Sequence, residues 1–195
     1  MDRSKHLKTE SQLKLYEEFK NLHTILDKAF LEQYSRSLPL ADTLMDRWER
    51  AQKLGFGDGT NIYDSSIVLG NPKVGTDCWI GPNTILDGSG GLEIGDYCTI
   101  SAGVEIYSHD NVKQTLSSGK YPIERSAVRI KNNVYLAPKA VIGKGVEIGE
   151  FSVIGAFSFV NKSVPAYSIA VGQPAKVIGR VRVEGDQITF DYSRK

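Results

Sequence analysis

The sequence predicts a mainly β protein, a parallel β-helix of six-residue repeats with helices before it and a short strand pair after it. Aliphatic residues recur every six positions, the fifth residue of each repeat is small or β-branched, and glycine often follows the aliphatic residue. The aliphatic positions are Ile62, Val68, Val74, Ile80, Leu86, Ile94, Ile100, Ile106, Ile130, Leu136, Ile142, Ile148, Ile154 and Val160. A sustained short period is typical of a β-helix, whereas an antiparallel sandwich shows alternation with hairpin turns.

Each repeat is expected to form one short strand and one corner, with its first and fifth residues facing inward. Three repeats make one coil, and stacked coils bury a continuous aliphatic column. The fifth positions are Ser66, Cys78, Thr84, Cys98, Val104, Val134, Ala140, Val146, Ser152, Ser158 and Val164. Glycine and asparagine tolerate the backbone conformations that a corner requires, so we expect the repeat glycines to serve those turns.

The two cysteines of the chain provide a test of this register. Once a small insertion between them is discounted, Cys78 and Cys98 lie three repeats apart and both hold a fifth position. They should therefore stack on adjacent coils, about 4.8 Å apart. Two cysteines do not make a disulfide framework, and we expect both to be reduced, buried packing groups.

The segments that flank the repeats follow other patterns. Residues 1–56 show apolar spacing typical of two amphipathic helices, which would cap the first coil or pack between subunits. The β-helix is expected over residues 57–180. Residues 181–195 contain two short β-type runs, Val181–Val183 and Ile188–Tyr192, which we interpret as a strand pair that covers the other open end.

Two interruptions of the repeat should leave the prism as loops at its corners. The first is the short run Asp87–Gly91, and the second is an inserted loop over residues 110–127 that includes Gly119 and Pro122 and has no repeat pattern. A long loop without structure of its own is usually functional.

Composition and charge narrow the class of partner. The formal net charge of +1 gives no reason to expect nucleic acid or a membrane surface as a partner. The sequence has no apolar run long enough to cross a bilayer, and its polar start does not resemble a signal peptide. We therefore expect a cytoplasmic protein.

Three stretches of the repeat region resemble one known family. They are Val128–Leu136, Val153–Ala156 and Val171–Arg180, the last with a Gly-x-Pro-Ala-Lys ending that coil formation does not require. Over about residues 62–180 the chain resembles the hexapeptide-repeat acyltransferases, and among them the galactoside and maltose O-acetyltransferases. The resemblance implies a left-handed β-helix, against the usual right-handed crossover. It also implies a homotrimer with active sites between neighbouring prisms, where the outward Trp79 would suit the interface.

By the same resemblance, His109 is the catalytic base, at the junction between the last regular coil and the long loop. It is also the histidine of the repeat region, since His6 and His23 lie in the helical segment. An imidazole accepts and releases a proton near neutral pH, as a general base must. Its orienting partner is left open among Asp110, Glu105, Asp87 and a backbone carbonyl. Asp87 and Asp110 are also candidates for contacts to the acceptor.

The resemblance further implies acetyl-coenzyme A as co-substrate, lying along a groove between two prisms. The positions that match cofactor contacts in the family are Tyr135, Ala156, Asn161, Lys162, Lys176 and Arg180. Lysine and arginine suit the phosphates of coenzyme A. No metal site is expected. One departure from the family is that His109 comes about two residues earlier than the histidine of galactoside acetyltransferase, which weakens any inference about the acceptor.

Four functions remain to be distinguished. The first is O-acetylation of a sugar in the synthesis of a cell-surface polysaccharide, and the second is N-acylation of a nucleotide-linked amino sugar. A β-helical carbonic anhydrase needs three histidines around one zinc, whereas His109 stands alone in the coils. A trimeric scaffold without catalysis would not require a junction histidine, a long loop and the Gly-x-Pro-Ala-Lys ending together.

Overall fold

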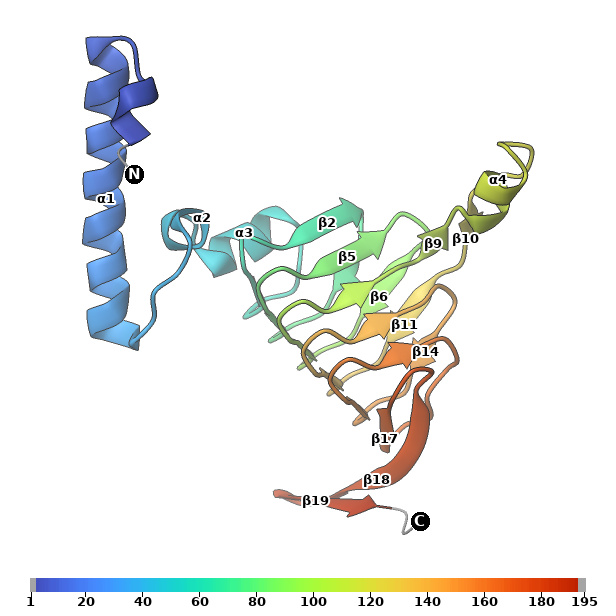
Figure 1. Cartoon of the computed structure of the whole chain (residues 1–195). Helices are drawn as coiled ribbons and strands as arrows, with labels where there is room; N and C mark the ends of the chain where they lie inside the picture. Colours follow the sequence, from blue (N-terminus) through green and yellow to red (C-terminus); the bar gives the residue numbers. More distant parts are fainter. Residues whose placement is uncertain (1–2, 193–195) are drawn as a thin grey trace. The chain divides into compact units, whose positions relative to one another are not determined.

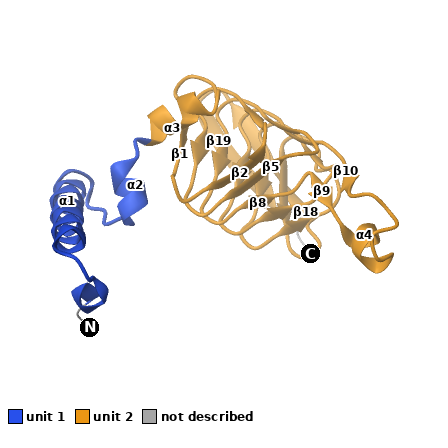
Figure 2. Ribbon diagram, turned by 90° about the horizontal axis from the view of Figure 1, so that it is seen from above, with its two compact units in different colours: residues 1–46 blue, residues 47–195 orange. Residues whose placement is uncertain are grey.

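The computed structural model describes residues 3–192 and divides into two units, residues 1–46 and residues 47–195 (Figure 2). The last three residues of the predicted C-terminal segment lie outside the described residues. Among residues 3–192, no helix combines the length and apolar character needed to cross a membrane.

The first unit contains a 3-10 turn (Arg3–His6), α1 (Glu10–Tyr34) and α2 (Leu40–Leu44). α1 begins with a capping box: the Thr9 hydroxyl accepts the Gln12 N–H, and the Gln12 side chain accepts the Thr9 N–H, both at 3.2 Å. The helix ends where Ser35 adopts the left-handed conformation, with φ of 52°. No residue of α1 is buried, so its predicted apolar stripe is exposed or at most half-buried.

The second predicted helix is divided into two. α2 ends at Leu44, Met45 is extended, and α3 (Arg47–Lys53) starts after it in the second unit. Ala51 of α3 is only 1% exposed and belongs to the aliphatic core of the prism. The Arg50 guanidinium donates to the carbonyls of Tyr63 and Ser66 beside the first coil. α3 therefore takes the capping role that the sequence predicts.

The second unit is a left-handed parallel β-helix with three sheets, whose coils stack one below another in Figure 1. The first sheet contains β1 (Asn61–Ile62), β4 (Trp79–Ile80), β7 (Thr99–Ile100), β12 (Tyr135–Leu136), β15 (Val153–Ile154), β17 (Ser168–Val171), β18 (Lys176–Glu184) and β19 (Gln187–Tyr192). The second contains β2 (Ile67–Gly70), β5 (Ile85–Gly88), β8 (Glu105–Ile106), β13 (Val141–Ile142) and β16 (Phe159–Val160). The third contains β3 (Lys73–Val74), β6 (Leu92–Ile94), β11 (Val128–Ile130) and β14 (Glu147–Ile148).

The predicted inward positions form the core. Every aliphatic first position is buried except Val68, which is partly buried, and every fifth position is buried. Each fully buried aliphatic side chain contributes about 1.5–3 kcal/mol relative to an exposed one. The repeat thus determines both the coil and the main source of its stability.

The register that the cysteines test is confirmed. Trp79 pairs with Thr99, so the residues just before them stack on adjacent coils. The Cys98 N–H donates to Cys78 Sγ at 3.4 Å, and both thiols are buried and free. Each thiol also donates to a carbonyl of the next coil, Cys78 to Gly95 at 3.0 Å and Cys98 to Lys131 at 3.1 Å.

The expectation that glycine and asparagine serve the corners is confirmed at the fourth position of the repeat and is wrong for the glycines at the second position. Left-handed backbone occurs at the fourth position of the repeat, in Asp77, Asn83, Tyr97, Gly103, Asn133, Lys139, Gly145, Phe151 and Phe157. Glycines at the second position, such as Gly95, do not have positive φ. A Cβ on Gly95 would lie 2.9 Å from the backbone nitrogen of Asn132 on the next coil. These glycines therefore allow stacked coils to approach closely.

The inserted loop has structure of its own, contrary to the prediction. β9 (His109–Asp110) and β10 (Glu124–Arg125) form an antiparallel ribbon, and α4 (Val112–Leu116) lies beyond it. We call residues 109–125 the arm, which leaves the prism as a separate projection in Figure 1.

The C-terminal strand pair exists but differs from its prediction in two respects. β18 begins at Lys176, five residues before the predicted strand, because it pairs antiparallel with β17 from Val171 onward. All six residues of β19 are exposed. The prediction that the pair covers the open end of the prism is therefore wrong for β19, which extends the first sheet instead.

Candidate active site

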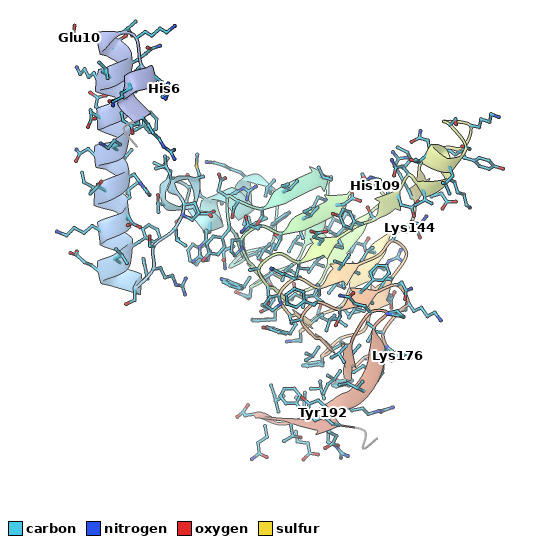
Figure 3. The ribbon with its side chains drawn as sticks, viewed as in Figure 1. His6, Glu10, His109, Lys144, Lys176 and Tyr192 are labelled. Atoms are coloured by element: carbon cyan, nitrogen blue, oxygen red, sulfur yellow. The ribbon has the colours of Figure 1, made fainter. Side chains whose placement is uncertain are left out.

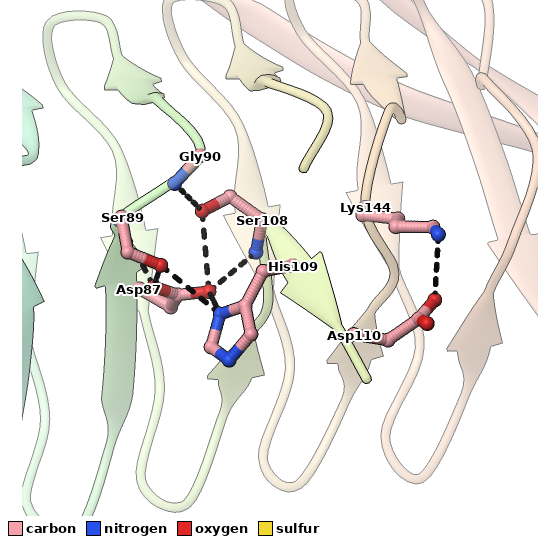
Figure 4. A network of polar contacts seen from close by, with 7 residues as sticks. All are labelled: Asp87, Ser89, Gly90, Ser108, His109, Asp110 and Lys144. Carbon is pink, nitrogen blue, oxygen red and sulfur yellow. Dashed lines mark hydrogen bonds and ion pairs between the residues drawn. The ribbon is translucent and has the colours of Figure 1, made fainter. Parts of the chain in front are cut away.

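Two stacked strands bring Asp87 and His109 together at one edge of the prism. β5 pairs in parallel with β8, with Leu86 beside Ile106. Asp87 directly follows Leu86, and His109 follows β8 at the start of the arm. The Asp87 Oδ2 lies 2.6 Å from His109 Nδ1 (Figure 4). Of the partners that the sequence leaves open for His109, the structure selects Asp87.

The Asp87 carboxylate is held by a set of donors. Its Oδ2 accepts the Ser108 N–H at 2.8 Å and the Ser108 hydroxyl at 3.1 Å, and its Oδ1 accepts the Ser89 N–H at 3.0 Å and the Ser89 hydroxyl at 2.6 Å. Its side chain is fully buried, and burial alone raises the pKa of Asp87. The hydrogen bonds from Ser89, Ser108 and His109 outweigh burial, so the pKa lies well below its usual value.

An ionised Asp87 determines which nitrogen of the His109 ring carries the proton. A carboxylate only accepts hydrogen bonds, so Nδ1 is the protonated nitrogen of the neutral ring and Nε2 has the lone pair. Nδ1 also lies 3.0 Å from the Ser89 hydroxyl oxygen. The His109 side chain is 32% exposed, and Figure 4 shows Nε2 on the side of the ring away from this network. Nε2 is therefore the atom able to take a proton from a bound molecule.

The short interruption Asp87–Gly91 is part of this site. The Gly90 N–H donates to the Ser108 hydroxyl at 2.8 Å. A Cβ on Gly90 would lie 2.2 Å from the Ser108 carbonyl oxygen, so a side chain at this position would displace the backbone next to His109. The repeat pattern alone does not reveal the contacts of Ser89, Gly90 and Ser108, although a break in the repeat one coil away from the histidine marks the place.

Asp110 and Glu105 have other partners. Asp110 Oδ2 lies 2.7 Å from Lys144 Nζ on the next coil, and Lys144 also lies 2.6 Å from Glu124 Oε2. The hydrogen bond from Lys144 lowers the pKa of Asp110, and those to Asp110 and Glu124 raise the pKa of Lys144. Asp110 therefore holds the arm and does not orient His109.

Glu105 accepts a hydrogen bond from the Tyr107 hydroxyl at 2.9 Å. Burial first, and then this bond and the nearby charge of Glu105, raise the pKa of Tyr107 to about 12. Tyr107 is thus a neutral donor at physiological pH.

The residues that match family contacts to the cofactor come from several strands of the prism. Asn161 and Lys162 follow β16, on the edge that also carries His109 after β8. Ala156 follows β15 of the first sheet, and Lys176 and Arg180 belong to β18. Figure 3 shows Lys176 in β18, apart from His109 and Lys144 at the root of the arm. Three of these segments meet at the last coil: the Ala175 N–H, next to Lys176, donates to the Phe159 carbonyl at 2.8 Å, two residues before Asn161, and the Gly155 N–H, next to Ala156, donates to the Ala170 carbonyl at 2.9 Å.

Tyr135 lines a groove between the first sheet and the C-terminal hairpin. The groove has a volume of about 460 Å³, and Tyr97, Val153, Val183 and Phe190 are among the other residues that line it. The remaining matched positions, Ala156 to Arg180, are not among its lining residues. The Tyr135 side chain is 43% exposed and is free to contact another molecule.

Comparison with known proteins gives the affiliation of the chain. A model of the bacterial transferase hexapeptide family, with six repeats, matches residues 127–162. Galactoside O-acetyltransferase of Escherichia coli (strain K12) is 30% identical over 142 residues, which cover 61% of this chain and 69% of that protein. A probable acetyltransferase of Mycobacterium tuberculosis is 32% identical over 123 residues, but these span only 37% of that protein.

A solved structure agrees with these sequence relatives. A variant of AntD, an N-acyltransferase from Bacillus cereus, in complex with dTDP and coenzyme A, superposes with a TM-score of 0.59 at 27% identity. The match covers 64% of this chain and 72% of that one. The chain therefore belongs to the hexapeptide-repeat acyltransferase family, as its repeat, its left-handed prism and the extent of its match to galactoside O-acetyltransferase show together.

Proposed function

We propose that the protein is an acetyl-coenzyme A-dependent O-acetyltransferase that acts on a sugar hydroxyl, in the synthesis of a cell-surface polysaccharide. The observation that carries this proposal is the contact of the His109 ring with a buried, ionised Asp87 at 2.6 Å, which leaves Nε2 as an outward-facing base. A scaffold protein does not require a partly exposed imidazole whose tautomer is fixed by a buried carboxylate and whose Nε2 is left open.

The reaction needs one proton acceptor and one site for the thioester. His109 Nε2 takes the proton of the acceptor hydroxyl as its oxygen attacks the acetyl carbonyl carbon. Asp87 stabilises the resulting imidazolium through Nδ1. When the tetrahedral species collapses, the carbon–sulfur bond breaks, the acetyl group stays on the acceptor oxygen, and the imidazolium returns the proton to the thiolate of coenzyme A. His109 thereby returns to its neutral form at the end of each turnover.

Exposed cations support acetyl-coenzyme A as the co-substrate. Lys162, Lys176 and Arg180 are exposed and, within residues 3–192, form no ion pair. Such cations suit phosphates. Tyr135 lines a groove that does not include these cations. We therefore propose that coenzyme A binds between two prisms of a homotrimer, in the cytoplasm, where acetyl-coenzyme A is available.

A second candidate reaction is N-acylation of a nucleotide-linked amino sugar. It is favoured by the likeness to AntD, which is an N-acyltransferase solved with dTDP and coenzyme A. The same base and the same thioester serve both reactions, because an amine and a hydroxyl both lose a proton when they attack the carbonyl. The two differ only in the acceptor.

The decisive experiment measures release of coenzyme A with a panel of sugars and nucleotide-linked amino sugars. His109→Gln should lower kcat by about two to four orders of magnitude, the usual worth of a positioned base. His6→Gln, a histidine of the N-terminal 3-10 turn, is the matched control and should keep full activity. Near-normal turnover in His109→Gln would remove the proposed base. Failure of the intact protein to bind coenzyme A in calorimetry would favour the scaffold reading.

A further inference from the structure

The arm places a cation directly opposite His109. β9 and β10 pair antiparallel with His109 beside Arg125. In the preceding pair, the Ser126 N–H donates to the Ser108 carbonyl at 2.9 Å. His109 and Arg125 therefore form the adjacent non-hydrogen-bonded pair, the type in which facing side chains lie closest. Their Cβ atoms are expected about 4.5–5.5 Å apart.

The two faces of this ribbon carry different charges. Asp110 and Glu124, the next pair, turn toward Lys144 and lie 2.7 and 2.6 Å from its Nζ. Successive side chains of a strand point to opposite faces, so Arg125 shares the face of His109. Figure 4 shows His109 and Asp110 on opposite sides of β9.

Arg125 is the uncompensated charge of the ribbon. The two acids of the ribbon are paired, Asp110 with Lys144 and Glu124 with both Lys144 and Lys113. Arg125 is exposed, and among residues 3–192 its guanidinium has no ion-pair or hydrogen-bond partner. A cation thus lies across the ribbon from the base with no anion assigned to it.

The position of Arg125 is fixed by backbone contacts at the root of the arm. Its neighbour Ser126 donates to the Ser108 carbonyl at 2.9 Å and accepts the Gly145 N–H at 3.1 Å. The Arg125 side chain therefore extends from a fixed backbone position across from His109, and not from the tip of the arm. Defined placement is what a group needs to orient a bound molecule.

We propose that Arg125 binds an anionic group, a phosphate or a carboxylate, of the acceptor, so that the enzyme selects negatively charged sugars. This inference rests on the proposed function. The acceptor must place its nucleophile at His109 Nε2, which brings the rest of the sugar within reach of Arg125. The phosphates of coenzyme A are separated from the thioester by the pantetheine arm, so an arginine beside the reacting carbonyl does not reach them. A guanidinium matches phosphate or carboxylate through two parallel hydrogen bonds.

The test compares one sugar without an anion, galactose, with the same sugar as galactose 1-phosphate and as galacturonic acid, using full-length protein and acetyl-coenzyme A. Arg125→Gln should lower kcat/KM for the anionic sugars about 10- to 100-fold, the loss of a charged hydrogen bond. It should change kcat/KM for galactose less than 3-fold. Arg125→Lys should restore part of the preference, since it keeps the charge and loses the bidentate fork. Arg129→Gln, an exposed arginine paired with Glu93, is the control and should behave as wild type.

Three results would overturn the inference while the proposed function stands. One is an equal loss for neutral and anionic sugars in Arg125→Gln. Another is a raised KM for acetyl-coenzyme A that disappears with the 3′-dephospho form, which would assign Arg125 to the donor. The third is dissociation of the oligomer in light scattering without altered selectivity, which would assign Arg125 to a neighbouring subunit. Absence of acetyl transfer to every acceptor by the wild type would instead reject the proposed function.

Discussion

Replacement of Asp87 by asparagine separates the charge of this residue from its shape. The carboxylate accepts five hydrogen bonds, three at Oδ2 and two at Oδ1. An amide has one acceptor and one donor end. If its oxygen faces His109, its NH2 faces the Ser89 N–H; if it is flipped, its NH2 faces the Ser108 N–H. Either way at least one backbone donor loses its acceptor, the part-buried Ser89 N–H in the first case and the buried Ser108 N–H in the second.

The expected magnitudes follow from this count. A buried donor without a partner costs about 1–3 kcal/mol of unfolding free energy, and the part-buried Ser89 N–H costs less, so the loss should lie at or below the lower end of this range if the amide oxygen faces His109. Because asparagine is neutral, the variant also lacks the negative charge that stabilises the imidazolium formed in the transition state. A hydrogen bond to a charged group is worth about 1.5–3 kcal/mol, so kcat should fall roughly 10- to 150-fold. KM for acetyl-coenzyme A should change little, because Asp87 is buried beneath His109.

The pH dependence of stability gives an independent measure of the same charge. Because the pKa of Asp87 is lowered in the folded protein from 3.8, its stabilising effect is complete well above that value and is lost as the pH falls through the folded pKa. Wild type and Asp87→Asn should therefore differ by a constant Tm above about pH 5 and converge at lower pH.

The assays are thiol release at saturating substrates for kcat and circular dichroism melting for Tm. Ser163→Ala is a suitable control, since its hydroxyl only accepts the Glu147 N–H at an exposed site. A kcat for Asp87→Asn within 3-fold of wild type, in a folded protein, would refute the role assigned to Asp87. A Tm difference that stays the same down to pH 3 would refute the lowered pKa of Asp87 in the folded protein.

Two further predictions concern packing. Gly90→Ala should lower kcat at least 10-fold while Tm falls by only a few degrees, because the new methyl would meet the Ser108 carbonyl next to His109. Normal activity, measured by thiol release, would contradict this geometry. Cys78→Ser should melt within about 3 °C of wild type, since the hydroxyl replaces the thiol as donor to the Gly95 carbonyl. Cys78→Leu should destabilise the coil by about 1–3 kcal/mol through overpacking. Equal Tm values for the two variants would argue against a tightly packed corner.

The sequence predicts the prism in some detail because the repeat is a local signal. A residue such as Ile100 or Cys98 is buried for the same reason as its equivalents six or more positions away. The two cysteines therefore stack as expected. The helical flank is less well predicted: Met45 is extended and divides the second helix, a break that the apolar spacing does not reveal.

The site is predictable only in part. His109 is identified by its place at the end of the regular coils and by the family resemblance. Its partner is not, because Asp110 and Glu105 are nearer in sequence than Asp87. Which carboxylate meets the ring depends on how the strands stack across the interruption after β5, and that is a property of the folded coil.

The repeat along the chain was enough to predict the coil, its aliphatic column and the histidine at its margin, since periodicity and residue type are local signals. The folded chain was needed to show that Asp87 lies beneath His109, that Lys144 ties down the arm, and that Arg125 has no ion-pair partner among residues 3–192. These hydrogen bonds and ion pairs join residues 20 or more positions apart, and the stacking of the coils, which no local pattern encodes, sets which side chains meet.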